Sequence, residues 1–515
     1  MTNGMNVSRR DLFKFGGLAA LGVAGASTLA GCGQPKTVAE AAAEKGLADT
    51  GAATGPAFLA PQEPITDFAE THEYDVVVVG AGESGLSAVH TALEAGARVA
   101  CVQNINAAQT TGNMAASIDL TQTDEAAVQA CVSFINWKSD YRSNRDLVNI
   151  WAHNSQEALA WWAEEAAKGG VESKPHDAVL SYNGYDIHLH ANTYFRIGHD
   201  EVVKAIAPIA ESAGVEFFFS CPAQQLVTDE SGRVTGVVCE EDGKNVLFNA
   251  SKGVILATGD YQCDPEMVAY YCPDIKEFPP CQMNRTGDGH KMGVWAGGEI
   301  EPTTHTKMIH DARVGRVDTP HLLVNAKGER FMCEGPMQGY LNNYVREYIH
   351  EAGGDAKAGN LYTIVDAKWQ DQIAEWKAID PEIDASNCKW FYEGNTIEEA
   401  CAAMAADTES GAYELDAAAV QATVDRYNEL CAKGSDDDFG KNPTFMRAID
   451  TPPFIVVPHE FGMGLSAIIG GLLINADNQV LKADEHTPID GLFAVGNVSG
   501  CFYGGVDYPM DVLGL

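Results

Sequence analysis

The clearest hydrophobic pattern in the chain is a run of four valines at residues 76–79, followed at once by glycines. A short, continuous, β-branched apolar run is typical of a strand that is buried on both faces of a sheet. The glycines Gly80, Gly82 and Gly85 then lead into an Ala/Leu-rich helix, and a second apolar strand follows at residues 98–102. The pattern therefore predicts strand, turn, helix and strand, in that order.

The three glycines have the G-x-G-x-x-G spacing of a dinucleotide-binding turn. The first glycine permits the tight turn, the second lets the backbone approach a pyrophosphate, and the third lets the helix pack on the strand. The phosphates would lie at the helix N-terminus. A glycine-rich turn without a ligand is the alternative. One residue departs from the pattern, because Gln103 stands where an acidic residue usually binds the ribose, although its amide oxygen can still accept a hydrogen bond.

Two later stretches differ in periodicity. Residues 124–169 have helical periodicity, with Trp161 and Trp162 expected on a buried seam. Residues 176–199 have little periodicity, so we expect a long loop or short strands there, which would be either a functional loop or a surface flap. The aromatic and histidine residues of that stretch are Tyr182, Tyr185, His188, His190 and Tyr194.

The remaining pattern predicts further strands that end in glycine. Residues 201–261 predict a helix, a strand at 215–220, a hairpin near residues 229–232 and a buried strand that ends at Gly259. The other predicted features are a glycine turn into a helix at 285–289, a hairpin at 322–334, a helix with an acidic turn at 415–441, and a strand running into glycine at 491–497. Residues 110–113, which include Thr111, Gly112 and Asn113, form a small-residue turn placed to contact a second part of the same cofactor.

Length and charge limit the function. A chain of 515 residues is too long for one ordinary core, so we expect two domains or one domain with a large insertion. The net charge of −38 argues against nucleic acid and anionic membrane surfaces as direct partners, because a polyanion would be repelled. A basic partner protein would be attracted.

The N-terminus has the form of an export signal. Residues 8–14 have the twin-arginine pattern, and an apolar stretch at 15–29 ends in a lipobox-like sequence before Cys32. We expect cleavage before Cys32, lipid on that cysteine, and an extracytoplasmic, membrane-anchored protein. A plain export signal with an incidental cysteine is the alternative. Residues 1–32 would be the signal and residues 33–70 a flexible tether rich in Ala, Gly, Thr and Pro.

Several motifs together resemble the flavoprotein subunit family of fumarate reductase and succinate dehydrogenase. They are ATG at 257–259, TGDG at 286–289, NAKGERF at 325–331 followed by Glu334, RYN at 426–428 and GLFAVGN at 491–497. The resemblance implies an α/β fold, in which a Rossmann-like FAD-binding domain at 71–330 and 455–515 is interrupted by a smaller α+β capping domain at 331–454. It also implies non-covalent FAD and hydride transfer across a carbon–carbon bond next to a carbonyl. Family members continue beyond the position of Leu515 with a further helix, so the sequence is expected to be a fragment or an impaired protein.

Carried over residue by residue, the resemblance implies a set of FAD contacts. They are Gly80, Gly82, Gly85, Gln103, Thr111, Gly112, Asn113, Thr258, Gly259, Asp288, Gly496 and Asn497.

The catalytic part of the family pattern is altered. Gln338 stands where the fumarate reductases have their proton-delivering arginine, four residues after the position of Glu334. Residues 466–471 read SAIIGG in place of a His-His-Thr-Met-Gly-Gly turn, and Asp507 replaces an arginine. A site that lacks these cations and gains a carboxylate does not suit a dicarboxylate anion. Fumarate and succinate are therefore poor candidates.

The replacements suggest a larger or less charged substrate. Tyr508 follows Asp507, and this end of the chain resembles the ketosteroid dehydrogenases, in which a tyrosine polarises or protonates the carbonyl side of the substrate. The chain also resembles the cardiac glycoside reductase type of exported flavoprotein. His305 falls near a substrate-side histidine of the family, and a purely structural histidine is the alternative. The resemblance thus gives Tyr508, Asp507, His305, Gln338 and Glu334 as catalytic candidates.

The function expected from these features is reduction of an activated double bond in an enone, an unsaturated lactone or an aryl acrylate. The alternatives are a ring desaturase and a non-catalytic flavin-binding lipoprotein. The cysteines show no C-x-x-C and no haem motif, and the spacing of Cys263, Cys272 and Cys281 matches no common iron–sulfur pattern. Thiols or a disulfide are favoured over a cluster at these three positions. The electrons should come from a membrane-associated donor such as a cytochrome.

Overall fold

The computed structural model describes most of the chain from residue 56 to residue 505. The described ranges are 56–110, 114–193, 201–276, 278, 280, 283–308, 319–335, 361–379, 383, 385, 388, 390–407, 414–459, 465–483 and 485–505. The predicted signal, the tether up to residue 55, and Thr111, Gly112, Asn113, Tyr194, Cys281, Gln338, Asp507 and Tyr508 lie outside these ranges. The contacts divide the chain into Met1–Ala57 and Phe58–Leu515, and the elements that follow η1 (Ala57–Leu59) belong to the second unit.

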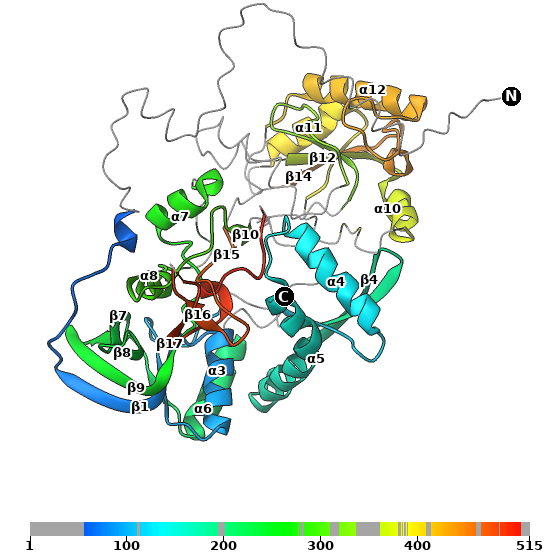
Figure 1. Ribbon diagram of the computed structural model, residues 1–515. Helices are drawn as coiled ribbons and strands as arrows, with labels where there is room; N and C mark the ends of the chain where they lie inside the picture. The colour runs from blue at the N-terminus through cyan, green and yellow to red at the C-terminus, as the bar shows by residue number, and fades with distance from the viewer. Residues whose placement is uncertain are drawn as a thin grey trace, which may run out of the picture. The chain divides into compact units, whose positions relative to one another are not determined.

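The largest sheet contains the predicted valine strand at its centre (Figure 1). Its main path is β16 (Gln479–Leu481), β17 (Pro488–Ala494), β9 (Lys244–Leu256), β1 (Glu70–Val79), β2 (Val99–Val102) and β6 (Glu216–Phe218), and the hairpin of β7 (Ala223–Thr228) and β8 (Val234–Glu241) pairs with β9. The strands β17, β9, β1, β2 and β6 run parallel.

Both faces of the valine strand are buried. Val77 and Val79 belong to one core cluster, whereas Val78 belongs to another, which it shares with residues of α3 (Glu83–Glu94) and α6 (Glu201–Ser212). Successive side chains of a strand point to opposite faces, so a strand in this position must be apolar throughout. This explains why the run of valines is continuous.

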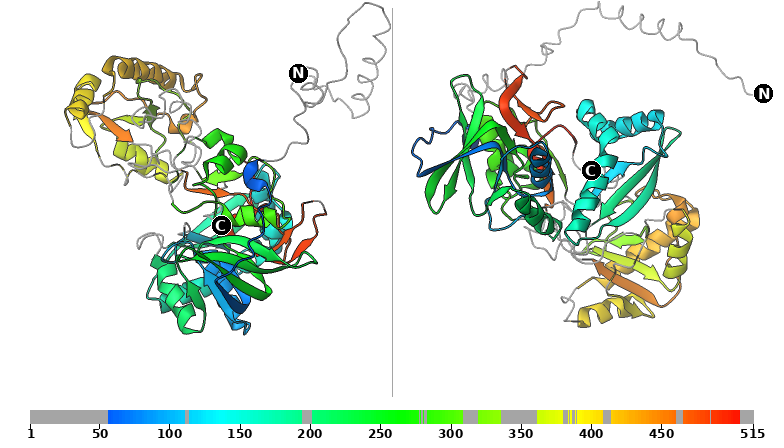
Figure 2. Two further views of the ribbon diagram at one scale, coloured as in Figure 1. Left: turned by 90° about the vertical axis from the view of Figure 1, so that its left-hand side faces the viewer. Right: turned by 90° about the horizontal axis from the view of Figure 1, so that it is seen from below.

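A three-stranded sheet and two helices form the region of residues 114–193. β3 (Met114–Ile118), β5 (Tyr185–Thr193) and β4 (Lys174–Tyr182) pack against α4 (Glu125–Lys138) and α5 (Arg145–Lys168) (Figure 2). The prediction of one helical stretch at 124–169 is wrong at Asp140 and Tyr141, where φ is 52° and 58° and the chain turns. Trp161 and Trp162 are only partly buried. Of the two forms expected for residues 176–199, strands are present, and they join at Asn183-Gly184 with φ of 52° and 84°.

A four-stranded antiparallel sheet has its own core. β11 (Leu322–Val324), β12 (Leu361–Asp366), β14 (Phe454–His459) and β13 (Tyr392–Gly394) lie in that order, with α10 (Trp369–Lys377), α11 (Ile397–Ala406) and α12 (Ala417–Lys433) (Figure 1). The apolar faces of α11 and α12 meet the sheet around Tyr362 and Tyr427. The division of the chain into an FAD-binding domain and a capping domain at 331–454 stays a prediction.

The remaining elements are short. β10 (Thr306–Met308) pairs with β15 (Ala467–Ile469). The other short elements are α7 (Pro265–Tyr271), η2 (Pro273–Ile275), α8 (Asp288–Trp295), η4 (Pro443–Phe445) and η5 (Gly496–Val498). The predicted glycine turns at 285–289 and 491–497 and the helix with an acidic turn at 415–441 are confirmed. Within the described part of the chain, no helix has the length and apolar character needed to cross a membrane.

Candidate active site

The turn between β1 and α3 shows why Gly80 and Gly85 are needed. A Cβ on Gly80, which has a φ of 112°, would lie 2.3 Å from the carbonyl oxygen of Ala257. A Cβ on Gly85 would lie 1.9 Å from the carbonyl oxygen of Gly80. Gly82 is different, because its φ of −91° suits any residue and a Cβ there would meet, among the described atoms, only Gln109 O at 3.2 Å. Packing excludes a side chain at Gly80 and Gly85, whereas at Gly82 a Cβ would make one tight contact, with the carbonyl oxygen of Gln109.

Two buried polar atoms near this turn lack a partner among the described residues. They are the hydroxyl oxygen Oγ1 of Thr258 and the amide oxygen Oε1 of Gln109. Thr258 lies near Gly80, since a Cβ on Gly80 would be 3.3 Å from its Cα, and the backbone carbonyl oxygen of Gln109 lies beside Gly82. A buried polar group without a partner is costly, so such groups are typical of a surface that a polar ligand completes. Sequence reasoning missed Gln109, because nothing in its spacing distinguishes it.

The other predicted cofactor residues are partly assembled around the same turn. A Cβ on Gly496 would lie 2.5 Å from Ser84 Oγ, which brings the end of β17 against the start of α3. Asp288 is the first residue of α8 and accepts a hydrogen bond from Thr286 Oγ1 at 2.6 Å. Gln103 is buried, and its Nε2 donates to Ala107 O at 3.2 Å. Gly259 has a φ of 76°, and Asn497 lies in η5.

His305 has internal partners on both ring nitrogens. Nε2 donates to Glu301 O at 2.9 Å, so Nδ1 of the neutral ring accepts from the Tyr261 hydroxyl at 2.6 Å. The ring stacks on Tyr271 and is 1% exposed. Burial lowers the pKa of His305 to about 3. A substrate role for His305 stays a prediction, and the contacts found in the structure are those of a structural histidine.

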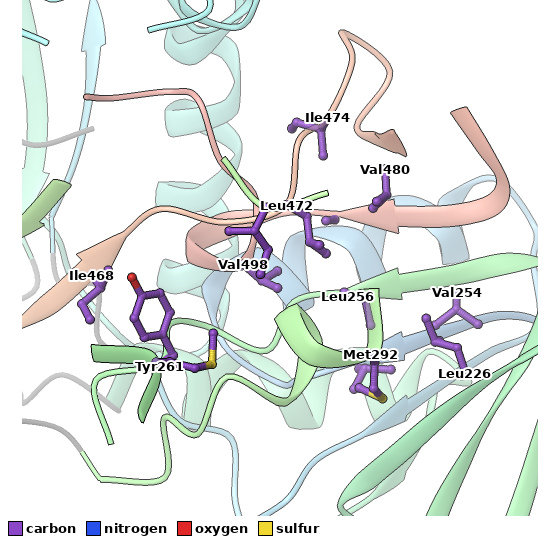
Figure 3. Close-up of a cluster of buried hydrophobic side chains, with 14 of the residues drawn as sticks. Leu226, Val254, Leu256, Tyr261, Met292, Ile468, Leu472, Ile474, Val480 and Val498 are labelled. Atoms are coloured by element: carbon purple, nitrogen blue, oxygen red, sulfur yellow. The ribbon is translucent and has the colours of Figure 1, made fainter. Parts of the chain in front are cut away.

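Residues 466–471 differ most from the family pattern. Hydrogen bonds with the side chains of Asp260 and Gln262 fix the backbone of this segment. Asp260 accepts from Ile468 N at 3.1 Å, and Gln262 Nε2 donates to Ser466 O at 3.0 Å. The segment continues into Leu472, which belongs to the same apolar cluster as Ile468 and Val498 (Figure 3). In the paired segments 301–308 and 465–472 the only Lys or Arg is Lys307, which is fully buried and bonded to Asp274 at 2.9 Å.

Glu334 lies in a buried cluster of charges, which we call the Arg330 cluster and which consists of Arg330, Glu334, Asp436 and Lys441. Arg330 donates to both oxygens of Glu334, at 2.8 and 2.7 Å, and to both oxygens of Asp436, at 3.0 and 2.7 Å. Lys441 Nζ lies 3.4 Å from Glu334 and donates to Tyr427 Oη at 2.9 Å. Burial alone would raise the pKa of Asp436, but the hydrogen bonds from Arg330 and from the Lys441 amide hold it well below its usual range. Every charge in this cluster has an opposite partner.

Comparison with known proteins decides the family. A family model described as FAD binding domain matches residues 75–508. The chain belongs to this FAD-binding family.

The most similar curated relatives include three reductases. Urocanate reductase of Eggerthella lenta is 26% identical over 84% of this chain and 70% of its own length, and vinyl phenol reductase of Lactiplantibacillus plantarum is 26% identical over 83% and 90%. Digoxin reductase of Eggerthella lenta is 25% identical over 98% and 94%. Together with the family match, these relatives show an FAD-dependent oxidoreductase, as the sequence predicted.

Two solved structures show the fold. The open form of a flavocytochrome c3 fumarate reductase has a TM-score of 0.62 at 22% identity and covers 85% of this chain and 74% of its own. A 3-ketosteroid Δ4-(5α)-dehydrogenase from Rhodococcus jostii has a TM-score of 0.60 at 22% identity and covers 87% and 95%. The predicted α/β fold with an FAD-binding domain and the predicted family resemblance are confirmed.

The residues near the glycine turn fit FAD. The N-terminus of α3 and the unpaired oxygens of Thr258 and Gln109 offer N–H donors and polar partners for a diphosphate and for sugar hydroxyls. The individual FAD contacts stay predictions. Within the described ranges, no group of three or more His, Cys, Asp or Glu side chains could hold a metal ion. Cys272 lies within hydrogen-bond distance of Tyr261 Oη at 3.6 Å and of His305 O at 3.8 Å.

Proposed function

We propose that this flavoenzyme reduces an activated carbon–carbon double bond in a neutral or bulky substrate, such as an enone, an unsaturated lactone or an aryl acrylate. The observation that carries the proposal is the charge of the paired segments 301–308 and 465–472. Their one cation, Lys307, is fully buried against Asp274 and so is not available to bind a carboxylate. In these two segments a dicarboxylate such as fumarate would find no free cation, and the neighbouring Arg142 donates to the carbonyl oxygens of Pro302 and Thr304.

The relatives support the same class of reaction. Urocanate reductase, vinyl phenol reductase and digoxin reductase are each named for the reduction of an unsaturated organic molecule. The fumarate reductases of Shewanella frigidimarina also match this chain, at 25% identity. We take the altered positions Gln338, Ser466 and Asp507 of the sequence as the feature that separates this chain from the fumarate pattern.

The proposed mechanism assigns the proton to the end of the chain. When bound and reduced, FAD would supply the hydride for the β-carbon of the substrate. Tyr508 would protonate the α-carbon or polarise the carbonyl group, and Asp507 would line the pocket or relay protons to Tyr508. Substitution of Tyr508 by Phe should lower kcat by roughly 10²–10⁴ while FAD still binds. A kcat of Tyr508→Phe equal to that of the wild type would contradict this assignment.

An acceptor screen tests the reaction class. The purified holoenzyme is reduced chemically without oxygen, candidate acceptors are added singly, and flavin absorbance is followed. We expect an enone, an unsaturated lactone or an aryl acrylate to reoxidise the flavin, and their saturated analogues to leave it reduced. If no activated alkene reoxidises the flavin, and a saturated ring ketone instead bleaches the oxidised holoenzyme, the protein is a desaturase and the proposal fails.

We also propose that the enzyme is exported, is anchored through lipid on Cys32 and receives electrons from a membrane-associated donor such as a cytochrome. The twin-arginine pattern at 8–14 and the lipobox-like sequence support the location. The net charge of −38 favours a donor with a basic docking face. Reduction by such a donor should slow as salt rises, because steering is screened over about 8 Å at physiological ionic strength. A rate that does not depend on salt would contradict the charge argument.

A further inference from the structure

Glu83 occupies an unusual place for a carboxyl group. It is the first residue of α3 and directly follows Gly82, the glycine of the turn at which a Cβ would meet the fewest described atoms. The residue keeps part of its surface exposed, and its carboxyl group is hydrogen bonded to Thr110. Thr110 is buried and directly follows Gln109, whose backbone carbonyl oxygen would lie 3.2 Å from a Cβ on Gly82. Glu83 thus lies where the cofactor diphosphate is expected.

The charges at this position conflict. The N-terminus of a helix stabilises one anion, through its free N–H groups and its dipole. A diphosphate and a carboxylate at the same terminus would repel each other, and in a site of low dielectric constant that repulsion is poorly screened. Protonation of Glu83 removes the conflict and turns the carboxyl group into a hydrogen-bond donor.

The surroundings of Glu83 raise the proton affinity of its carboxyl group before any ligand is considered. Burial raises the pKa of Glu83 to about 7, and the hydrogen bond from Thr110 opposes this only in part. No charged side chain in the described part of the chain contributes to this shift. From the neighbouring elements, Cys101 of β2 has a thiol whose pKa is raised to about 12 by burial, so it stays neutral, and Asp288 of α8 is bonded to Thr286.

We propose that Glu83 is part of the FAD site and that FAD binds with a proton on its carboxyl group, so that cofactor affinity is linked to pH. The proposal rests on FAD binding and does not depend on which substrate the enzyme reduces. The negative diphosphate raises the proton affinity of Glu83 further, so binding takes up a proton at a pH where the free site has lost it. Affinity is highest below about pH 7 and falls as the pH rises.

Binding of FAD to the full-length apoprotein tests the proposal. The Kd is measured by flavin fluorescence from pH 6 to pH 8.5, and proton uptake by calorimetry in two buffers of different ionisation enthalpy. For the wild type we expect the Kd to rise about tenfold from pH 6 to pH 8, with net proton uptake near pH 8. Glu83→Gln, which has the same shape and no charge, should bind with a Kd that is independent of pH over this range.

Two comparisons make the outcome decisive. Glu94→Gln removes the same charge from the exposed far end of α3 and should keep the wild-type pH profile. Glu301 is a second buried carboxyl group whose pKa is raised to about 7, so the assignment depends on the loss of pH dependence in Glu83→Gln. A flat wild-type profile without proton uptake, or a Glu83→Gln variant that keeps the pH dependence, would overturn the proposal. If Glu83→Gln does not fold, Glu301→Gln gives the complementary test: an unchanged pH profile in that variant supports the proposal, and loss of the pH dependence overturns it.

Discussion

The glycine turn of the FAD site and the Arg330 cluster are both buried and polar, yet they differ in how completely the protein satisfies them. Near the turn, Thr258 Oγ1 and Gln109 Oε1 have no partner among the described residues. In the Arg330 cluster each of the four charges meets an opposite charge. An unpaired buried polar group costs about 1–3 kcal/mol, which a protein tolerates where a ligand supplies the missing bond. The difference is the one expected between a binding site and a part of the scaffold, and other unpaired atoms, such as Ser155 Oγ, lie elsewhere in the described part of the chain.

The largest effect is expected from breaking the Arg330 cluster. Arg330→Met leaves Glu334 and Asp436 buried without their main partner, and the free energy of unfolding should fall by about 3–5 kcal/mol. Urea unfolding measures this loss. The control is Arg426→Met, which removes an exposed arginine bonded to Asp438 and Glu429 and should change stability little. Equal losses in the two variants would show that the buried cluster contributes no more than a surface ion pair.

The next largest effect is expected on FAD affinity, and it distinguishes Gly82 from Gly85. Gly82→Ala should fold, since its Cβ meets only one described atom, at 3.2 Å, but it should fill space needed by FAD. Overpacking of about 1–3 kcal/mol corresponds to a roughly 5- to 150-fold rise in the Kd for FAD. Gly85→Ala should instead fail to fold, because its Cβ would lie 1.9 Å from Gly80 O. Wild-type FAD affinity in Gly82→Ala would place the diphosphate elsewhere.

The smallest effect concerns the unpaired hydroxyl. Thr258→Val removes a group that has no protein partner, so apoprotein stability should hold or rise, while FAD binding should weaken about 2- to 10-fold through a lost hydrogen bond. Thr363→Val is the matched control, because Thr363 Oγ1 lies 2.7 Å from His459 Nε2. That variant should lose stability and keep its FAD affinity. The same pattern in both variants would remove the distinction between the two kinds of buried polar group.

The sequence predicts the glycine turn well, because a Cβ at Gly80 or Gly85 would clash with the backbone and only glycine avoids the clash. The residue type itself is therefore the signal. The turn between α4 and α5 is not predictable in this way. Asp140 and Tyr141 adopt positive φ without being glycine, and the turn packs against Gly504 and Gly505, more than 350 residues later in the chain. The strands β4 and β5 could have been predicted, because Asn183-Gly184 between two extended runs is a strong hairpin signal.

The partners of the predicted catalytic residues also depend on distant contacts. His305 is bonded to Tyr261, 44 positions away, and Arg330 joins Glu334 to Asp436, 106 positions from Arg330. Spacing along the chain could not show that His305 is enclosed or that Glu334 is fully paired. The family resemblance gave the residues, and only the structure gave their surroundings.

The most direct test of the proposed function varies only the charge of the substrate. Chemically reduced holoenzyme is mixed without oxygen with the methyl ester of an aryl acrylate, with the free acid of the same molecule, or with fumarate, and the rate of flavin reoxidation is recorded in a single turnover. We expect the ester to react fastest, the acid at least about tenfold more slowly, and fumarate not measurably, because each added carboxylate lacks a cation to bind it. Reoxidation by fumarate as fast as by the ester would contradict the account.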